Sequence, residues 1–242
     1  MAVCLNLFLA ILISRIIPNQ KQREKIPYRT LLVSVFTAVS HSSVTRRILL
    51  MQGFAFLVFN LFWTSITLLL SSEPYGFNTF QIGLVSLAGL AGAIISTGVG
   101  KLQDMGLGVN ALGLFIILYA FSMILGIFSG DVLYLIIACA IIMSLGFQGV
   151  SILNQTLLFS LNPGARSRIN TAFVTNNFAF GAVGSLLASW LWAFGGWRSI
   201  CIGATCALAI SLSVWFASRR KLDRAIGKRS CNKSICAYRD HL

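Results

Sequence analysis

Long apolar segments, separated by short polar breaks, set the pattern of this sequence. Segments 48–70 and 80–100 are apolar and flank the polar break 71–79. Each holds about the 20 residues that a helix needs to cross a bilayer core roughly 30 Å thick. Backbone groups in that core must find hydrogen bonds within the helix itself. The two segments therefore predict a membrane hairpin.

Five more apolar segments extend the pattern in both directions: 1–17, 109–128, 132–161, 169–194 and 199–217. Their breaks, at 129–131, 162–168 and 195–198, contain Gly, Pro or charged residues, which end a helical pattern. The charges of the first segment follow it rather than precede it, unlike those of a signal peptide, so we expect a short first helix. The sequence predicts an all-α integral membrane protein with seven transmembrane helices.

The charged residues predict how these helices are oriented. With alternating helices, every Lys and Arg except Arg198 falls on one side of the membrane, in the loop 18–47 and its flanks, the turns after 100 and 161, and the basic tail 218–242. Basic loops stay in the cytoplasm. We expect the N-terminus outside, the C-terminus inside, and the apolar stretch 31–39 of the first loop at the membrane interface.

Composition agrees with this class and excludes others. Of 242 residues, 57% are hydrophobic and 10% charged, and the mean hydropathy is +0.82, outside the range of soluble domains. The net charge of +13 follows from cytoplasmic basic loops, so we expect no nucleic-acid partner. The six cysteines have no metal or redox spacing and are expected to be apolar fillers or free thiols. We expect no cofactor, no metal and no enzyme activity.

Ionisable residues are absent from the middle of every predicted helix. A retinal-binding protein needs a lysine at depth, a voltage sensor a row of arginines, and a proton relay an acidic residue or histidine. The sequence argues against all three classes. It also disfavours a further class, the seven-helix receptors.

Neutral polar residues form one stripe on each of two helices: Asn60, Thr64 and Thr67 on the first, and Ser144, Gln148, Ser151 and Gln155 on the second. Two interpretations stay open. The stripes hydrogen-bond neighbouring helices, or they face a shared aqueous cavity. Trp63, beside the first stripe, is an aromatic contact for a solute or a packing residue. The candidate cavity residues are Asn60, Trp63, Thr64, Gln148, Ser151 and Gln155.

Small residues recur every fourth position on two other helices, at Gly92, Ser96 and Gly100 and again at Gly181, Ser185 and Ser189. Such spacing allows helices to approach closely. From residue 48, the order of a polar-striped, a small-residue and a plain apolar helix occurs twice. Because each unit has three helices, the second is inverted relative to the first, as in secondary transporters.

Short motifs carry a resemblance to a known family. Phe62-Trp63-Thr64, the run 81–84, the run 165–171 and Gly196-Trp197-Arg198 are similar to pieces of bacterial drug and sugar efflux members of the major facilitator superfamily. The resemblance covers about residues 1–218. It implies that 48–217 is the second six-helix half of such a transporter, that 1–17 is the helix before it, and that the protein exports small molecules across the bacterial inner membrane.

The cytoplasmic loop signature of that family, G-x-L-x-D-R-x-G-R, is matched in part. Gly100, Leu102 and Asp104 fit, whereas Met105 and Gly108 replace the two arginines. We expect Asp104 to cap the next helix and to pair with a basic residue, or to be an ordinary turn aspartate.

The family's first five helices, which commonly carry coupling acids, have no counterpart in the sequence. The resemblance therefore implies an incomplete transporter, whose partners are the lipid bilayer, a small-molecule solute and a missing N-terminal half or a second copy. The alternative is a non-transporting membrane fragment or assembly partner from an interrupted gene.

Overall fold

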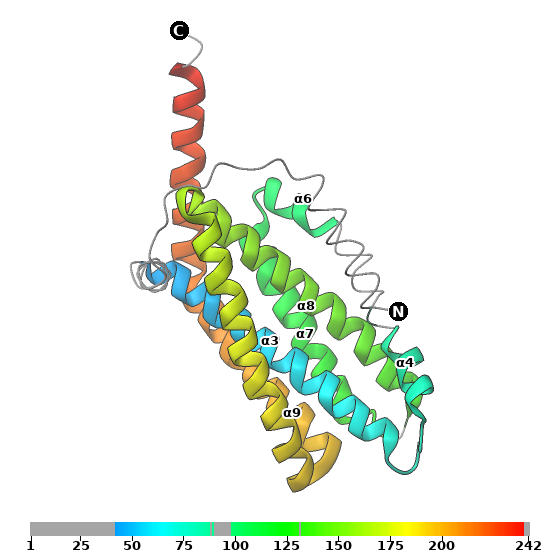
Figure 1. Ribbon diagram of the computed structural model, residues 1–242. Helices are drawn as coiled ribbons and strands as arrows, with labels where there is room; N and C mark the ends of the chain where they lie inside the picture. The colour runs from blue at the N-terminus through cyan, green and yellow to red at the C-terminus, as the bar shows by residue number, and fades with distance from the viewer. Residues whose placement is uncertain (1–41, 88, 90–97, 131, 240–242) are drawn as a thin grey trace, which may run out of the picture. The chain divides into compact units, whose positions relative to one another are not determined.

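The described part of the chain is helical throughout. A computed structural model describes residues 42–87, 89, 98–130 and 132–239, and these contain helices and turns but no strand (Figure 1). The all-α prediction is confirmed for them. The expected first helix 1–17, the interfacial stretch 31–39 and nearly all of the loop 18–47 lie outside the described residues.

The first described helix, α3, runs over Ser43–Ser71. It begins before residue 48 because Ser42 is its N-cap and accepts a hydrogen bond from the backbone N–H of Thr45 at 3.3 Å. The helix ends where the polar break was predicted. The next helix, α4 (Thr79–Ser86), begins with a capping box in which Asn78 and Gln81 bond each other's backbone N–H.

Within the described residues, four helices are long and apolar enough to cross a membrane: α3, α7, α8 and residues 166–224 of α9. The element bounds after α4 are α6 Val99–Asp104, α7 Gly108–Ile127, α8 Leu133–Leu161, η2 Pro163–Ala165 and α9 Arg166–Arg239. The predicted breaks after 128 and 161 coincide with the ends of α7 and α8. The described residues thus bear out a multi-pass helical membrane protein.

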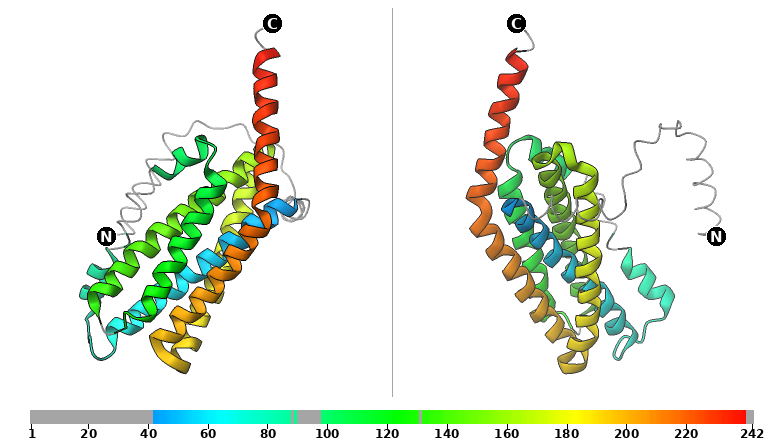
Figure 2. Two further views of the ribbon diagram at one scale, coloured as in Figure 1. Left: turned by 180° about the vertical axis from the view of Figure 1, so that it is seen from behind. Right: turned by 60° about the vertical axis from the view of Figure 1, so that its left-hand side comes forward.

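The helix α9 contains two helices separated by a kink. Gly195 and Gly196 have non-helical backbone angles, and Gly196 has φ +58°, which an L side chain rarely adopts. A Cβ on Gly203 would lie 2.8 Å from Leu191 Cδ1, so the chain folds back on itself after the kink (Figure 2). We call residues 166–194 the first arm and 197–239 the second arm. The break lies within the predicted turn 195–198.

Side-chain contacts fix the relative directions of the helices. Asn176 of the first arm bonds the carbonyl of Leu49 and Gly184 lies against Leu57, so this arm runs parallel to α3. The second arm runs antiparallel to α3, because Ser211 bonds the carbonyl of Met51 and Arg47 that of Ala217.

Helix α7 packs tightly against α8. Cβ atoms on Gly146 and Gly149 would collide with Tyr119 and the ring of Phe115, so the two helices are antiparallel and in close contact. The buried Tyr119 hydroxyl donates to the carbonyl of Ala55 at 3.2 Å, which ties α7 to α3. Helix α7 therefore has the direction of α3, and α8 runs against both.

Because α3 and α7 run in the same direction, the chain must return across the bundle within residues 72–107. The sequence predicted this return at 80–100, and much of that segment lies outside the described residues. Gly89 is described, and a Cβ there would lie 2.9 Å from the ring of Trp63 on α3. The return therefore passes α3 at the level of Trp63.

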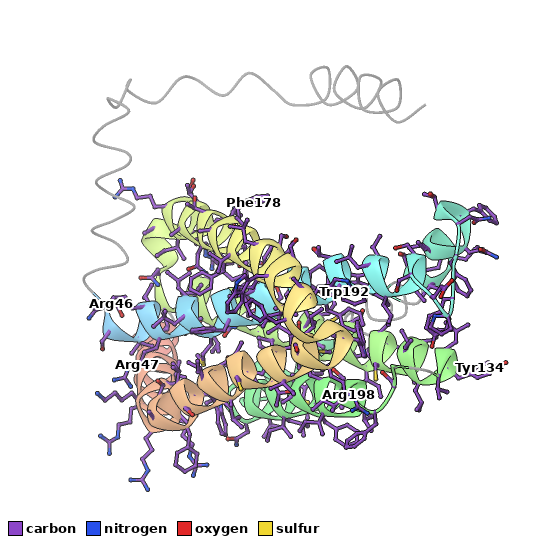
Figure 3. The ribbon with its side chains drawn as sticks, turned by 90° about the horizontal axis from the view of Figure 1, so that it is seen from below. Arg46, Arg47, Tyr134, Phe178, Trp192 and Arg198 are labelled. Carbon is purple, nitrogen blue, oxygen red and sulfur yellow. The ribbon has the colours of Figure 1, made fainter. Side chains whose placement is uncertain are left out.

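The described cations gather at one end of the helices. Helix α3 begins with Arg46 and Arg47, and the first arm begins with Arg166 and Arg168. The second arm returns to the same end, where it carries Arg219, Arg220, Lys221 and Arg224. Arg198 lies beside the kink, and Figure 3 shows it apart from Arg46 and Arg47. The helix directions thus reproduce the charge asymmetry that the sequence predicted.

Three cysteines have side chains that the structure describes, and none of these three forms a disulfide. Cys139 and Cys201 are buried and Cys206 is exposed, and all three are free thiols. Cys201 packs against Gly126 of α7, as expected of a small apolar filler.

Candidate functional site

Polar side chains join α3 to α8 at a largely buried seam formed by Gln52, Ser151 and Asn154. The Gln52 side-chain amide donates to Ser151 Oγ at 3.3 Å, and its carbonyl accepts from Asn154 Nδ2 at 3.2 Å. Gln52 and Asn154 have no exposed surface. Ser151, predicted to line a cavity, is therefore engaged in helix packing, in line with the first interpretation of its stripe.

We expect Gln52→Leu to destabilise the protein, because it removes both bonds while keeping the side-chain volume. Hydrogen bonds between membrane helices contribute about 1 kcal/mol or less each, so the loss should be about 1–2 kcal/mol. Reversible unfolding in mixed micelles measures it. In a double-mutant cycle with Asn154→Leu, an interaction energy of zero would contradict the seam.

Aromatic rings continue this seam toward Trp63. Phe59 of α3 stacks on Phe147 of α8 with ring centroids 4.2 Å apart, and Trp63 meets Phe59 edge-on at 6.2 Å. The indole of Trp63 also faces Gly89. Trp63 is half-buried and packed against the hydrophobic core, so one edge of its ring remains available to a solute.

Asn60 and Gln155 both lie toward the first arm of α9. A Cβ on Gly181 of that arm would lie 2.9 Å from Asn60 Nδ2, and Asn60 itself donates to the carbonyl of Phe56 in its own helix at 3.0 Å. Gln155 Nε2 is 3.4 Å from Asn170 Oδ1. Asn60 and Gln155 thus contact the first arm at two positions, Gly181 and Asn170, which are eleven residues apart.

Thr64 and Gln148 differ from the other candidates. Both side chains are half-buried, and within the described residues neither has a hydrogen-bond partner. Their donors and acceptors are not used for packing there, so they are the candidates best placed to bind water or a solute.

Four buried polar atoms also lack a partner among the described residues: Thr45 Oγ1, Ser144 Oγ, Asn154 Oδ1 and Asn177 Oδ1. Ser144 belongs to the α8 stripe, and a Cβ on Gly89 would lie 3.7 Å from its oxygen. A buried hydroxyl without a partner costs free energy unless a bound molecule satisfies it. The Trp63 and Ser144 side chains thus border one neutral, partly aromatic region.

Sequence reasoning missed Gln52 and Asn154, and it placed the small-residue contact only in part. Of the predicted triplet, Gly181 is buried against Phe56, whereas Ser185 is half-buried and Ser189 is exposed. The closest approach belongs to Gly184, three residues after Gly181, whose Cα lies against the Leu57 carbonyl. The spacing at this contact is therefore three residues, and the four-residue groove is wrong beyond Gly181. Gly92 and Ser96 lie outside the described residues.

The partial loop signature lies in α6 and the turn after it. Gly100 and Leu102 are half-buried, and Leu102 packs against the core. Asp104 is the last residue of α6, and the N-cap of α7 is Leu107, which makes no side-chain cap bond. Gly106, with φ +77°, turns the chain between Asp104 and the start of α7. The capping role of Asp104 stays a prediction, because the structure does not describe its side chain.

The described ranges contain no set of three His, Cys, Asp or Glu side chains that could hold a metal ion. The candidate site consists of neutral amides, hydroxyls and aromatic rings.

Comparison with known proteins gives the class. The chain is similar to bacterial transporters. It is 34% identical over 229 residues to a protein of Escherichia coli O157:H7 named "Uncharacterized transporter YgaY", and equally similar to the "Putative uncharacterized transporter YgaY" of Escherichia coli strain K12. Both matches cover 93% of this chain and 57% of the relative.

A third relative comes from a different group of bacteria. "Probable transporter SCO4007" of Streptomyces coelicolor is 29% identical over 201 residues, which are 83% of this chain and 46% of the relative. No protein-family model matches the chain. The chain spans about half the length of the curated relatives that it matches. With the four apolar helices, this likeness supports a multi-pass transmembrane transporter.

Proposed function

We propose that this chain provides one half of a small-molecule exporter of the major facilitator type in a bacterial inner membrane. In this proposal α3, α8 and the first arm of α9 form one wall of a solute cavity. Thr64 and Gln148 bind the solute, Trp63 contacts it with its ring, and Asn60, Ser151 and Gln155 shape the wall. A second set of helices, from an N-terminal half or from another copy, closes the cavity.

One observation carries the proposal: half-buried neutral polar side chains that have no hydrogen-bond partner among the described residues lie in helices whose sequence is similar to that of transporters. Thr64 and Gln148 are these side chains, and the relatives' names supply the transport class. A neutral, partly aromatic wall suits an organic solute with apolar and hydrogen-bonding parts rather than a bare ion.

Co-expression tests the proposal. The chain is expressed alone and with the part of the Escherichia coli relative that it does not match, and export of a panel of fluorescent organic compounds is measured in inverted vesicles. We expect export to rise above that of either part alone when both are present. Export by the chain alone would favour self-association, and no export in any combination would favour the non-transporting alternative.

The chain alone should show no proton-driven transport. Moving charge through the bilayer centre without a titratable or coordinating group costs several kcal/mol, and the predicted spans contain no such group at depth. Reconstitution in vesicles with an imposed pH gradient measures this directly. Solute accumulation that follows the gradient would contradict the view that coupling resides outside these helices.

A further inference from the structure

A basic and aromatic surface lies where the second arm of α9 passes the start of α3. The Arg47 guanidinium donates to Ala217 O and Ser218 Oγ, both at 3.2 Å, and so ties the two helices together (Figure 3). Trp215 Nε1 donates to Val109 O at 2.9 Å, which fixes its ring against α7. Hydrogen bonds to α3 and α7 therefore hold the second arm at this surface.

Arginine and aromatic side chains are stacked on this surface. Arg219 Cζ lies 5.3 Å from the ring centroid of Phe216 and 6.0 Å from that of Trp215. The Phe216 side chain is 69% exposed. Aromatic rings next to arginines are typical of the level at which lipid headgroups meet acyl chains. The stacking orients the Arg219 guanidinium above an exposed apolar ring.

A shallow hollow lies directly beside these residues. Leu212, Ser213, Phe216 and Ala217 line it, and two of the four are apolar side chains large enough to contact an acyl chain. Arg220 lies four residues after Phe216, and Arg224 four residues after Arg220, so all three share one face of the second arm. One helix face thus carries an apolar hollow followed by exposed guanidinium groups.

The charge of this region favours an anionic ligand. Arg46, Arg219, Arg220, Lys221 and Arg224 are exposed, and the described turns of the second arm around them hold one acidic residue, Asp223. Within the described part of the chain none of these cations forms an ion pair. The guanidinium group of an arginine can donate two hydrogen bonds to the oxygens of one phosphate. An anionic headgroup also attracts these cations by its net charge, which a zwitterionic headgroup lacks.

We propose that this surface is a binding site for an anionic phospholipid. The phosphate of the headgroup binds Arg219, Arg220 and Arg224, and an acyl chain lies in the hollow lined by Leu212 and Phe216. Arg47 acts as a positioning residue, because it holds the second arm against α3. The bound lipid would bridge α3 and the second arm at the basic end of the bundle, and this site does not depend on the proposed cavity.

The full chain, purified in a neutral detergent and titrated with phosphatidylglycerol or phosphatidylcholine, tests the proposal by native mass spectrometry. We expect selective retention of phosphatidylglycerol, and we expect the double variant Arg219→Gln/Arg220→Gln to weaken it roughly tenfold, since each cation near an anionic surface contributes measurably to binding. The variant Arg219→Lys/Arg220→Lys keeps the charge but loses the planar guanidinium groups, so its affinity should lie between that of the original protein and that of the Gln variant.

Two controls separate this site from general charge attraction. Arg166→Gln/Arg168→Gln removes the same charge from the same end of the bundle but leaves the hollow intact, and its affinity should stay within twofold of the original. Inorganic phosphate in excess should not displace the lipid. Equal binding of phosphatidylcholine, an equal loss in the Arg166/Arg168 pair, displacement by phosphate, or retention of no lipid would each overturn the proposal.

Discussion

Gly184→Ala should destabilise the protein by about 3 kcal/mol, at the upper end of the usual cost of overpacking. A Cβ at this position would overlap the backbone carbonyl oxygen of Leu57 on α3. Backbone cannot move aside as a flexible side chain can, so the first arm and α3 must separate. Reversible unfolding in mixed micelles, or unfolding by steric trapping, measures the change.

A matched control is available in α4. Gly83 is helical and exposed, and a Cβ there would meet nothing within 4 Å. Gly83→Ala should leave the unfolding free energy unchanged or raise it by up to about 1 kcal/mol, because alanine favours helix over glycine. Equal effects of the two substitutions would mean that the close contact between the first arm and α3 does not contribute to stability.

Gln148→Leu should reduce export at least tenfold in the assembled transporter, with little loss of stability. The substitution keeps the volume of the side chain and removes its donor and acceptor. Because Gln148 has no hydrogen-bond partner within the described residues, the folded protein loses no bond that the structure records. A tenfold effect corresponds to about 1.4 kcal/mol, the contribution of one good hydrogen bond to a solute.

The comparison with Gln52→Leu makes this prediction specific. The chemical change is identical, but Gln52 makes two hydrogen bonds to α8. We expect stability to fall for Gln52→Leu and export to fall for Gln148→Leu. If Gln148→Leu lowered the unfolding free energy as much as Gln52→Leu does and left export intact, the α8 stripe would serve packing alone.

Local signals predicted the elements of this fold well. The polar break 71–79, the turn at Pro163 and the break at Gly195-Gly196 were each predicted from a few adjacent residues, and the helices end or kink there. The alternating directions of successive helices were predicted from the charges of the loops between them. The number of transmembrane helices stays a prediction, since 1–17 and much of 80–100 lie outside the described residues.

The rotation of each helix about its axis was harder to predict. Asn60 and Trp63 are three residues apart, which is roughly 60° around a helix. This difference in angle decides whether a side chain on α3 faces the first arm, as Asn60 does, or the side of α8, as Trp63 does. In a segment that is apolar on all sides, hydrophobic periodicity gives little information on which face is buried. Gln52 was missed for this reason, although its face includes Phe59 and Trp63.

Cysteine labelling in the membrane tests the central claim most directly. In a chain without its native cysteines, single cysteines replace Asn60, Thr64, Gln148, Ser151 and Gln155, and a membrane-impermeant thiol reagent is applied from each side of the assembled protein. We expect cysteines at Thr64 and Gln148 to react fastest and the cysteine at Ser151 to react slowest. As controls, single cysteines also replace Phe178 and Leu186, which are exposed apolar positions of the first arm, and these should stay unlabelled. Protection of all five stripe positions would contradict the cavity and return both stripes to helix packing.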